Sequence, residues 1–110
     1  MFAPADQATF LGAYGRWLAS SVQGAMDGEL DGYLDDYGAF VSPWGFDLEA
    51  ITVPVLLVQG EQDLFVPTSH ARRLAERCPD SELWLTPDDG HISVFEHGER
   101  PVGWLLDRMP

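Results

Sequence analysis

One short segment restricts the fold of this chain more than any other. Residues 53–59 read VPVLLVQ, an apolar and β-branched run without polar alternation. A strand that is apolar on both faces is typical of a parallel sheet with helices on both sides. The run contains Pro54 and is far too short to cross a bilayer. It therefore predicts a buried parallel strand rather than a membrane segment.

The residues after this strand predict an α/β arrangement. A turn-rich loop separates the strand from the next element, and the elements that follow are a helix over 68–77, a strand over 82–86 and a helical stretch over 92–108. Strand, helix, strand and helix in this order indicate parallel strands with flanking helices. In the last stretch the candidates for burial are Val102, Trp104, Leu105 and Leu106.

The N-terminal part has a different pattern. Residues 4–44 carry apolar side chains at helical spacing, which predicts two helices separated at Asp27 and Gly28. Asp6 is the expected N-cap of the first helix. In the second, from Leu30 to Val41, an aromatic stripe of Tyr33, Tyr37 and Phe40 is expected to face the core. We divide the chain into a helical segment over 1–46 and an α/β part over 47–110.

Two parallel strands are too few for the sheet that the apolar run implies. A strand such as residues 55–58 requires neighbours on both edges, and the chain offers one partner strand. The sequence therefore predicts part of a larger sheet.

Composition excludes several classes of function. The chain has 110 residues, 18 acidic against 6 basic side chains, and a formal net charge of −12. This charge repels phosphate backbones and anionic lipids, so binding to nucleic acid or a membrane surface is not expected. One cysteine cannot form an internal disulfide, and no signal peptide is recognisable. We expect a soluble, cytoplasmic protein.

Two loops carry the residues that could do chemistry. Asp63 follows the first predicted strand, and His91 follows the second. Catalytic groups in open parallel sheets gather beyond the carboxyl ends of the strands, so the two side chains are expected to meet. An aspartate that binds a histidine ring fixes its tautomer and stabilises the imidazolium, which makes this pair two thirds of a nucleophilic triad.

These motifs resemble the α/β-hydrolase family. The segment VPVLLVQGEQDLFVP resembles the penultimate strand and acid loop of that fold, and DDGHIS resembles its histidine loop, in the family's order. Residues 4–44 resemble the end of a helical cap, and residues 43–51 the return from cap to core. The resemblance implies a serine hydrolase for small ester or amide substrates, without a metal or organic cofactor. It assigns Asp63 as catalytic acid and His91 as general base, with Trp44 and Phe65 as candidate substrate contacts.

The nucleophile of the family pattern is missing. No G-x-S-x-G motif occurs in the 110 residues, and the family's oxyanion-hole loop is also absent. We therefore expect a C-terminal fragment or truncated copy that is inactive as an isolated chain. The resemblance also leaves acyltransferase, peptidase, dehalogenase or cofactor-free oxygenase chemistry open.

Other reactive side chains favour simpler interpretations. The carboxylates of Asp88 and Asp89 are expected to be solvated, and no metal site is expected because no second histidine is suitably spaced. His70 and His97 are expected to be structural or solvent-facing, and Cys78 to be a buried, unreactive thiol. The aromatic stripe, with Trp17 and Trp44, could alternatively line an acyl pocket.

A function of another class also stays open. An unpaired sheet edge with uncovered apolar surface could make the chain an interaction module. It could self-associate through that edge, or bind a complementing chain as one half of a split hydrolase.

Overall fold

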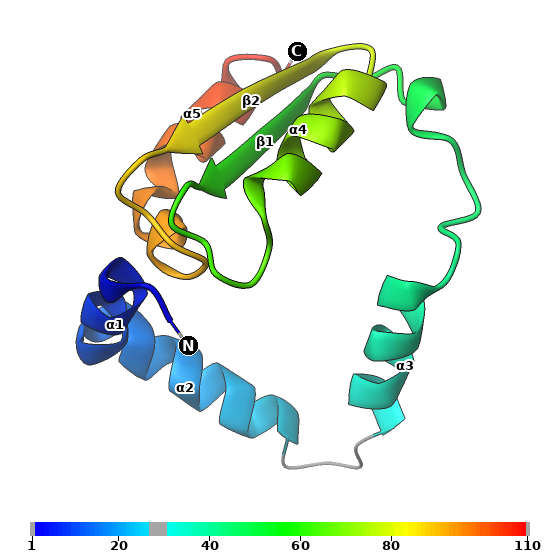
Figure 1. The fold of residues 1–110 in the computed structure, drawn as a ribbon. Coiled ribbons are helices and arrows are strands. Elements are labelled where there is room, and N and C mark those ends of the chain that lie inside the picture. Colours follow the sequence, from blue (N-terminus) through cyan, green and yellow to red (C-terminus); the bar gives the residue numbers. More distant parts are fainter. Residues whose placement is uncertain (1, 27–30, 110) are drawn as a thin grey trace.

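The computed structural model describes residues 2–26 and 31–109. Along the chain its elements are α1 (Pro4–Leu11), α2 (Ala13–Met26), α3 (Asp31–Val41), the 3-10 turn η1 (Leu48–Ala50), β1 (Val55–Gly60), α4 (Thr68–Arg77), β2 (Ser81–Thr86), the 3-10 turn η2 (Ser93–His97) and α5 (Glu99–Leu106). Figure 1 shows the three N-terminal helices in an arc below the strands. The expected order of strand, helix, strand and helix after residue 50 is confirmed.

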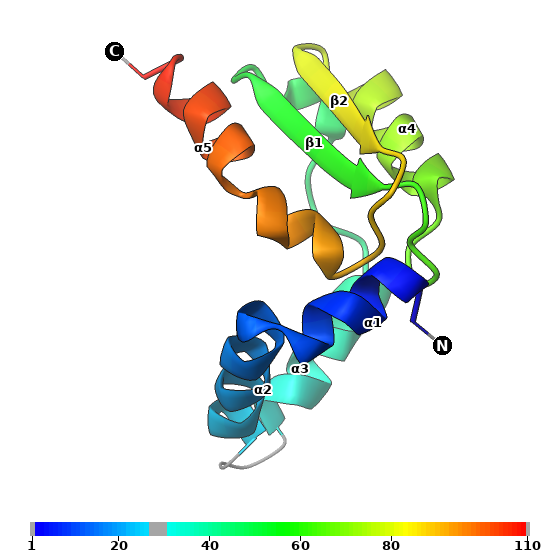
Figure 2. The same cartoon turned by 90° about the vertical axis from the view of Figure 1, so that its left-hand side faces the viewer.

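The sheet consists of β1 and β2, which pair in parallel with Val55 opposite Ser81 and Gly60 opposite Thr86. Backbone hydrogen bonds extend the pairing at both ends: Glu61 N–H donates to the Thr86 carbonyl over 2.9 Å, and Val55 N–H donates to the Asp80 carbonyl over 2.8 Å. Figure 2 shows α4 on one side of the strands and α5 on the other. The α/β prediction with helices on both faces is therefore confirmed.

The two faces of the sheet receive different side chains. Leu83 lines one surface cavity together with Ala75 of α4, which places it on the α4 side. Trp84 lies on the α5 side, where the Arg100 guanidinium stands 5.2 Å above its ring. Most residues of both strands are half-buried, Glu82 being exposed and Gly60 buried, so each face is partly covered. The expected full burial is wrong, because only one strand flanks β1 among the described residues.

The final helical stretch is also more exposed than expected. Of the four burial candidates only Trp104 is half-buried, and its indole N–H donates to Glu82 over 2.7 Å. Val102, Leu105 and Leu106 are exposed, so their expected burial is wrong. The reason is geometric: α5 presents one face to the sheet, and no described element covers its other face.

The N-terminal segment starts with two helices where one was expected. Gly12 separates α1 from α2, and Gly15 lies so close to the Phe10 backbone that a Cβ there would collide with it. The expectation that Asp6 caps the helix is wrong. Pro4 begins α1, and the Asp6 side chain is buried elsewhere in the fold. The expected stop at Asp27 and Gly28 lies outside the described residues, as does Leu30.

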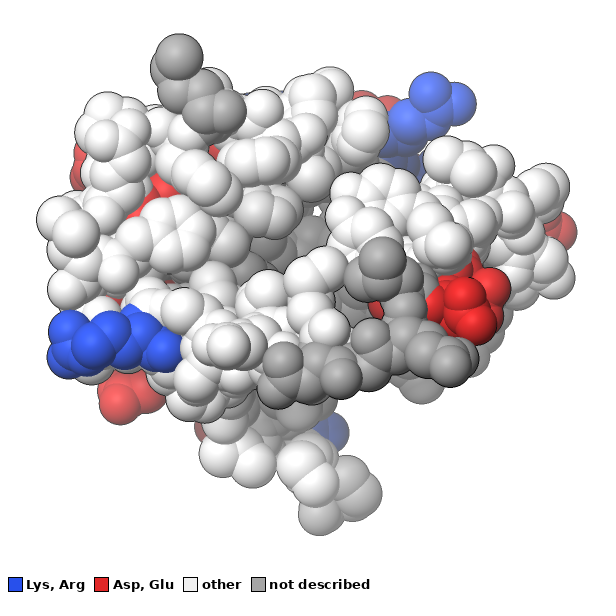
Figure 3. Space-filling model, turned by 90° about the horizontal axis from the view of Figure 1, so that it is seen from below, with Lys and Arg blue, Asp and Glu red and all other residues white. Residues whose placement is uncertain are grey.

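The aromatic stripe on α3 is not in a core. Tyr33, Tyr37 and Phe40 contact one another along the helix, yet their exposed fractions are 50%, 56% and 79%. Seen from below, this side of the molecule is formed mainly of uncharged residues, with charged groups toward its margins (Figure 3). The expected core role of the stripe is therefore wrong for this structure.

None of the described helices is long and apolar enough to cross a membrane.

A substitution at Gly60 tests how closely β1 packs against the loop after β2. A Cβ on Gly60 would collide with the backbone carbonyls of Asp89 and Gly90, whereas a Cβ on Gly103 in α5 would meet nothing. We expect Gly60→Ala to lower the free energy of unfolding by about 1–3 kcal/mol. Gly103→Ala is the matched control and should raise it by about 0.5–1 kcal/mol. Urea unfolding of both variants measures this, and equal effects would contradict the close approach at Gly60.

Candidate active site

The loops after β1 and β2 lie side by side because their strands end together. Gly60 is opposite Thr86, and in the next residues the Gln62 N–H donates to the Asp89 carbonyl over 2.8 Å. This arrangement brings the His91 ring to the Asp63 carboxylate, with 2.9 Å between His91 Nδ1 and Asp63 Oδ2. The structure therefore joins the two residues that the sequence placed 28 positions apart.

Four donors surround the carboxylate of Asp63. Its Oδ1 accepts the backbone N–H groups of Phe65 and Val66 over 2.8 and 2.9 Å. Its Oδ2 accepts Gln59 Nε2 over 2.9 Å, in addition to the histidine. Only 5% of the side chain is exposed. These four donors form a cage around the carboxylate. The cage holds the loop in place and fixes the orientation of the Asp63 side chain.

The same contacts decide the charge of Asp63. Burial acts to raise its pKa, but the Val66 N–H, the His91 side chain and the Phe65 N–H act to lower it, and the pKa lies below its usual value. The carboxylate is therefore ionised at neutral pH. An ionised carboxylate can only accept hydrogen bonds, so the proton in its bond with His91 belongs to Nδ1.

This tautomer leaves the other ring nitrogen of His91 ready to take a proton. In a neutral ring with hydrogen on Nδ1, Nε2 carries the free lone pair. Within residues 2–26 and 31–109, no hydrogen bond engages Nε2. The ring is 38% exposed. The arrangement is chemically that of a general base whose orientation is set from behind by a carboxylate.

Two side chains that hold the loops of the site were not assigned to it by the sequence analysis. Gln59 supports the acid loop, because its Nε2 donates to both Asp63 Oδ2 and the Val66 carbonyl. A polar residue at the end of an apolar strand was the signal for it. Asp6 accepts three backbone N–H groups of the histidine loop. No local sequence pattern reveals a contact across 85 residues.

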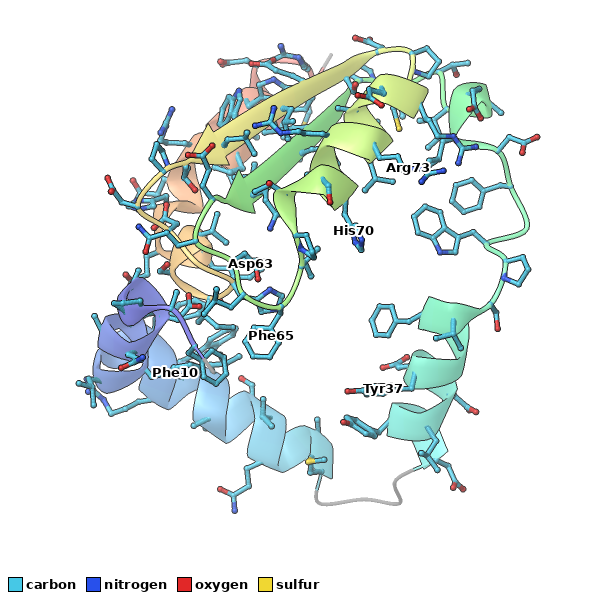
Figure 4. The ribbon with its side chains drawn as sticks, in the orientation of Figure 1. Phe10, Tyr37, Asp63, Phe65, His70 and Arg73 are labelled. Atoms are coloured by element: carbon cyan, nitrogen blue, oxygen red, sulfur yellow. The ribbon has the colours of Figure 1, made fainter. Side chains whose placement is uncertain are left out.

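Phe65 lies beside the histidine. The centroids of the Phe65 and His91 rings are 5.1 Å apart, and Phe2 packs on Phe65 at 4.9 Å. Figure 4 shows Phe65 close to Asp63, with Phe10 on its lower side. A cavity of about 150 Å³ is lined by residues of β1, both loops and η2, including Asp63 and His91. A small group could reach the pair from this cavity.

Trp44 lies in a different place. It stacks on Phe46 with ring centroids 5.7 Å apart, and both line a cavity of about 410 Å³ with His70 and Arg73 of α4. Neither Asp63 nor His91 lines this larger cavity. The structure thus brings Phe65 to the pair and leaves Trp44 apart from it.

The remaining candidates have structural surroundings. Cys78 is buried and His70 is exposed on α4, both as expected. His97 is largely exposed, with Nε2 3.5 Å from Asp89 Oδ1. Asp89 is buried, so the expectation that both carboxylates of the turn are solvated is wrong for it, although Asp88 is exposed. Among the described residues no three His, Cys, Asp or Glu side chains gather closely enough to hold a metal ion.

The tautomer of His91 is a direct test of the pair. In the wild type we expect neutral His91 to carry its proton on Nδ1, because ionised Asp63 accepts it. In Asp63→Asn the amide no longer requires this arrangement, and the proton should move to Nε2. Long-range proton–nitrogen correlation spectra of the histidine-labelled chain, recorded where the ring is neutral, report the protonated nitrogen.

Asp88→Asn is the matched control. It removes a carboxylate from the exposed turn that precedes His91, without touching the Asp63 cage. It should keep the wild-type tautomer. A wild-type spectrum with the proton on Nε2 would contradict the geometry of the pair.

Comparison with known proteins places the chain in a family. Residues 5–98 match the family model described as alpha/beta hydrolase fold. A protein from Caulobacter sp. (strain K31), named carbamate hydrolase RutD, is 49% identical over 45 residues, which are 41% of this chain and 17% of that protein. A protein of the same name from Stutzerimonas stutzeri is 35% identical over 68 residues, covering 58% and 26% of the two chains.

A further relative has another name. The 2-hydroxy-6-oxononadienedioate/2-hydroxy-6-oxononatrienedioate hydrolase of Paraburkholderia phymatum is 36% identical over 64 residues, covering 58% of this chain and 22% of its own length. The matched segments thus span about a quarter or less of these relatives. The family model, in contrast, covers most of this chain and includes both loops of the site. The chain therefore belongs to the α/β-hydrolase fold family.

Proposed function

We propose that this chain supplies the catalytic acid, Asp63, and the general base, His91, of a serine hydrolase that acts on ester- or amide-type carbonyl substrates. The observation that carries the proposal is the 2.9 Å contact between His91 Nδ1 and Asp63 Oδ2, with Nε2 unengaged among the described residues. Membership of the hydrolase family supports it. So do the relatives' names, which denote hydrolysis of carbamates and of oxo acids, both carbonyl compounds.

The nucleophile in this proposal comes from a segment outside these 110 residues. The sequence has no G-x-S-x-G motif. The hydroxyls of Ser20, Ser21, Ser42 and Ser81 donate to backbone carbonyls, and the Ser93 hydroxyl accepts the Gly90 N–H. No serine of the described part is hydrogen bonded to His91 Nε2. By itself the chain should therefore not turn over an ester.

The geometry of the pair gives His91 and Asp63 different chemical roles. A serine hydroxyl placed against Nε2 would lose its proton to His91 as its oxygen attacks the substrate carbonyl. The same proton would then pass to the leaving group. Asp63 stays ionised throughout, because its cage of donors stabilises the charge, and it stabilises the imidazolium. Phe65 would contact the substrate beside the His91 ring. Trp44 would contact only a substrate that extends into the larger cavity.

A graft tests the proposal. Residues 5–98 would replace the corresponding segment of the Stutzerimonas stutzeri relative, which supplies the rest of the fold. We expect the graft to hydrolyse a p-nitrophenyl ester. Asp63→Asn and His91→Ala should each lower kcat by about 10⁴-fold, because the serine then lacks its oriented base.

Two matched variants control for the substitutions themselves. Asp88→Asn removes an exposed carboxylate from the same loop, and His97→Ala removes a largely exposed histidine. Both should retain turnover within about threefold of the graft, since neither reaches the acid–base pair. Turnover of Asp63→Asn or His91→Ala at the level of these controls would refute the assignment.

A second candidate function rests on the open edge of β1. Val55 and Glu61 donate their N–H groups to the β2 side, so strand alternation directs those of Leu56 and Val58 to the other edge. No described strand pairs there. Such an edge accepts a further strand, either from a second copy or from a chain that completes the hydrolase sheet.

Light scattering after size-exclusion chromatography distinguishes this candidate. If the edge binds a second copy, the 110-residue chain should elute as a dimer or larger species. Replacing the exposed Leu105 and Leu106 of α5 by lysine should shift it toward monomer, because charge on an exposed apolar helix face opposes association. A clean monomer that binds no apolar dye would count against self-association.

A further inference from the structure

The most completely buried side chain in the described part belongs to an aspartate. Asp6 has an exposed fraction of 0%. No Arg or His side chain of the described residues forms an ion pair with it. A buried carboxylate without a cation is costly unless hydrogen bonds replace its hydration. Its partners therefore indicate what the residue does.

All three of its backbone partners lie in the histidine loop. Oδ2 accepts the His91 N–H over 3.0 Å, and Oδ1 accepts the N–H groups of Ile92 and Ser93 over 2.8 and 3.0 Å. Burial acts to raise the pKa of Asp6, but the N–H donors of Ser93, Ile92 and His91 and the Ser93 hydroxyl lower it, and the pKa lies below its usual value. The charged form is therefore the one that the loop stabilises.

The loop is shaped around this carboxylate. Gly90 lies against it so closely that a Cβ on Gly90 would collide with the Asp6 carboxylate. The Gly90 N–H donates to the Ser93 hydroxyl over 2.7 Å, which closes the turn. His91 is thus held twice, at its backbone by Asp6 and at its ring by Asp63.

We propose that Asp6 is a positioning residue for His91: its carboxylate binds three consecutive amides of the histidine loop and so fixes where the imidazole stands. The catalytic consequence rests on the proposed function, because it requires His91 to be the base. The physical reason is that proton transfer requires the base in a precise position, since displacing it by about 1 Å lowers the rate on the order of 100-fold. The helix that carries Asp6 must then be docked before the base is in place.

The contact can be observed in the 110-residue chain without any substitution. Scalar couplings across the hydrogen bonds should connect the amide nitrogens of His91, Ile92 and Ser93 to the Asp6 carboxyl carbon. Those three amides should also exchange slowly with solvent. Rapid exchange together with absent couplings would overturn the proposal, whatever the stability of any variant.

Asp6→Asn tests the consequence for the ring. The asparagine retains one acceptor oxygen and turns an NH₂ group toward the loop, so at least one amide loses its partner. We expect faster amide exchange at residues 91–93 and loss or broadening of the His91 Nδ1–H signal. In the graft, kcat should fall by about 10- to 100-fold with KM unchanged.

Thr9→Val is the matched control. Thr9 is also buried on α1 and its hydroxyl donates to Glu96 over 3.2 Å, but it does not touch the histidine loop amides. It should leave the His91 signal and kcat unchanged. Equal effects of Asp6→Asn and Thr9→Val on both readouts would show only that α1 must be docked, and would overturn a specific role of Asp6.

The readouts separate this proposal from the proposed function. If Asp6→Asn displaces the His91 signal while His91→Ala leaves hydrolysis by the graft intact, positioning stands and the catalytic assignment fails. If His91→Ala abolishes hydrolysis while Asp6→Asn leaves signal and kcat at wild-type levels, the catalytic assignment stands and the role of Asp6 is refuted.

Discussion

The parallel pairing of β1 with β2 is the constraint on which the site depends. Both strands run in the same direction and end at paired residues, Gly60 and Thr86, so the following loops leave the sheet together. The loops then bind each other through the Gln62 N–H and the Asp89 carbonyl. A shift of one residue in this register would turn the side chains of one strand to the opposite face and separate the loops. The contact between Asp63 and His91 is thus a consequence of sheet register.

Buried carboxylates organise the loops that the sheet brings together. Asp63 and Asp6 both lie out of solvent, and backbone N–H groups together with neutral or histidine side chains surround them instead of arginine. Amide donors belong to the backbone and have fixed directions, so each carboxylate fixes a loop conformation as well as a charge. His91 lies between the two, and this explains how the histidine loop holds the imidazole in one orientation.

The covering of the sheet is incomplete over the described residues. Both strands are half-buried where their composition indicates full burial, and three apolar side chains of α5 are exposed. The aromatic stripe of α3 is exposed as well. This exposed apolar surface is what makes association with another chain the second proposed function.

The sequence by itself determined the α/β order, the bounds of α4 and the two loops that carry Asp63 and His91, because period and loop chemistry are local properties. Burial could not be predicted from the sequence, because the exposed fraction of Val102 or Leu105 depends on which residues are its neighbours in space. Only the tertiary structure decided the hydrogen bonds around Asp63, the break at Gly12 and the hydrogen bonds of Asp6 to the histidine loop. A hydrogen bond between residues 85 positions apart leaves no trace in local pattern, because it exists only once the fold has brought α1 to the end of the sheet.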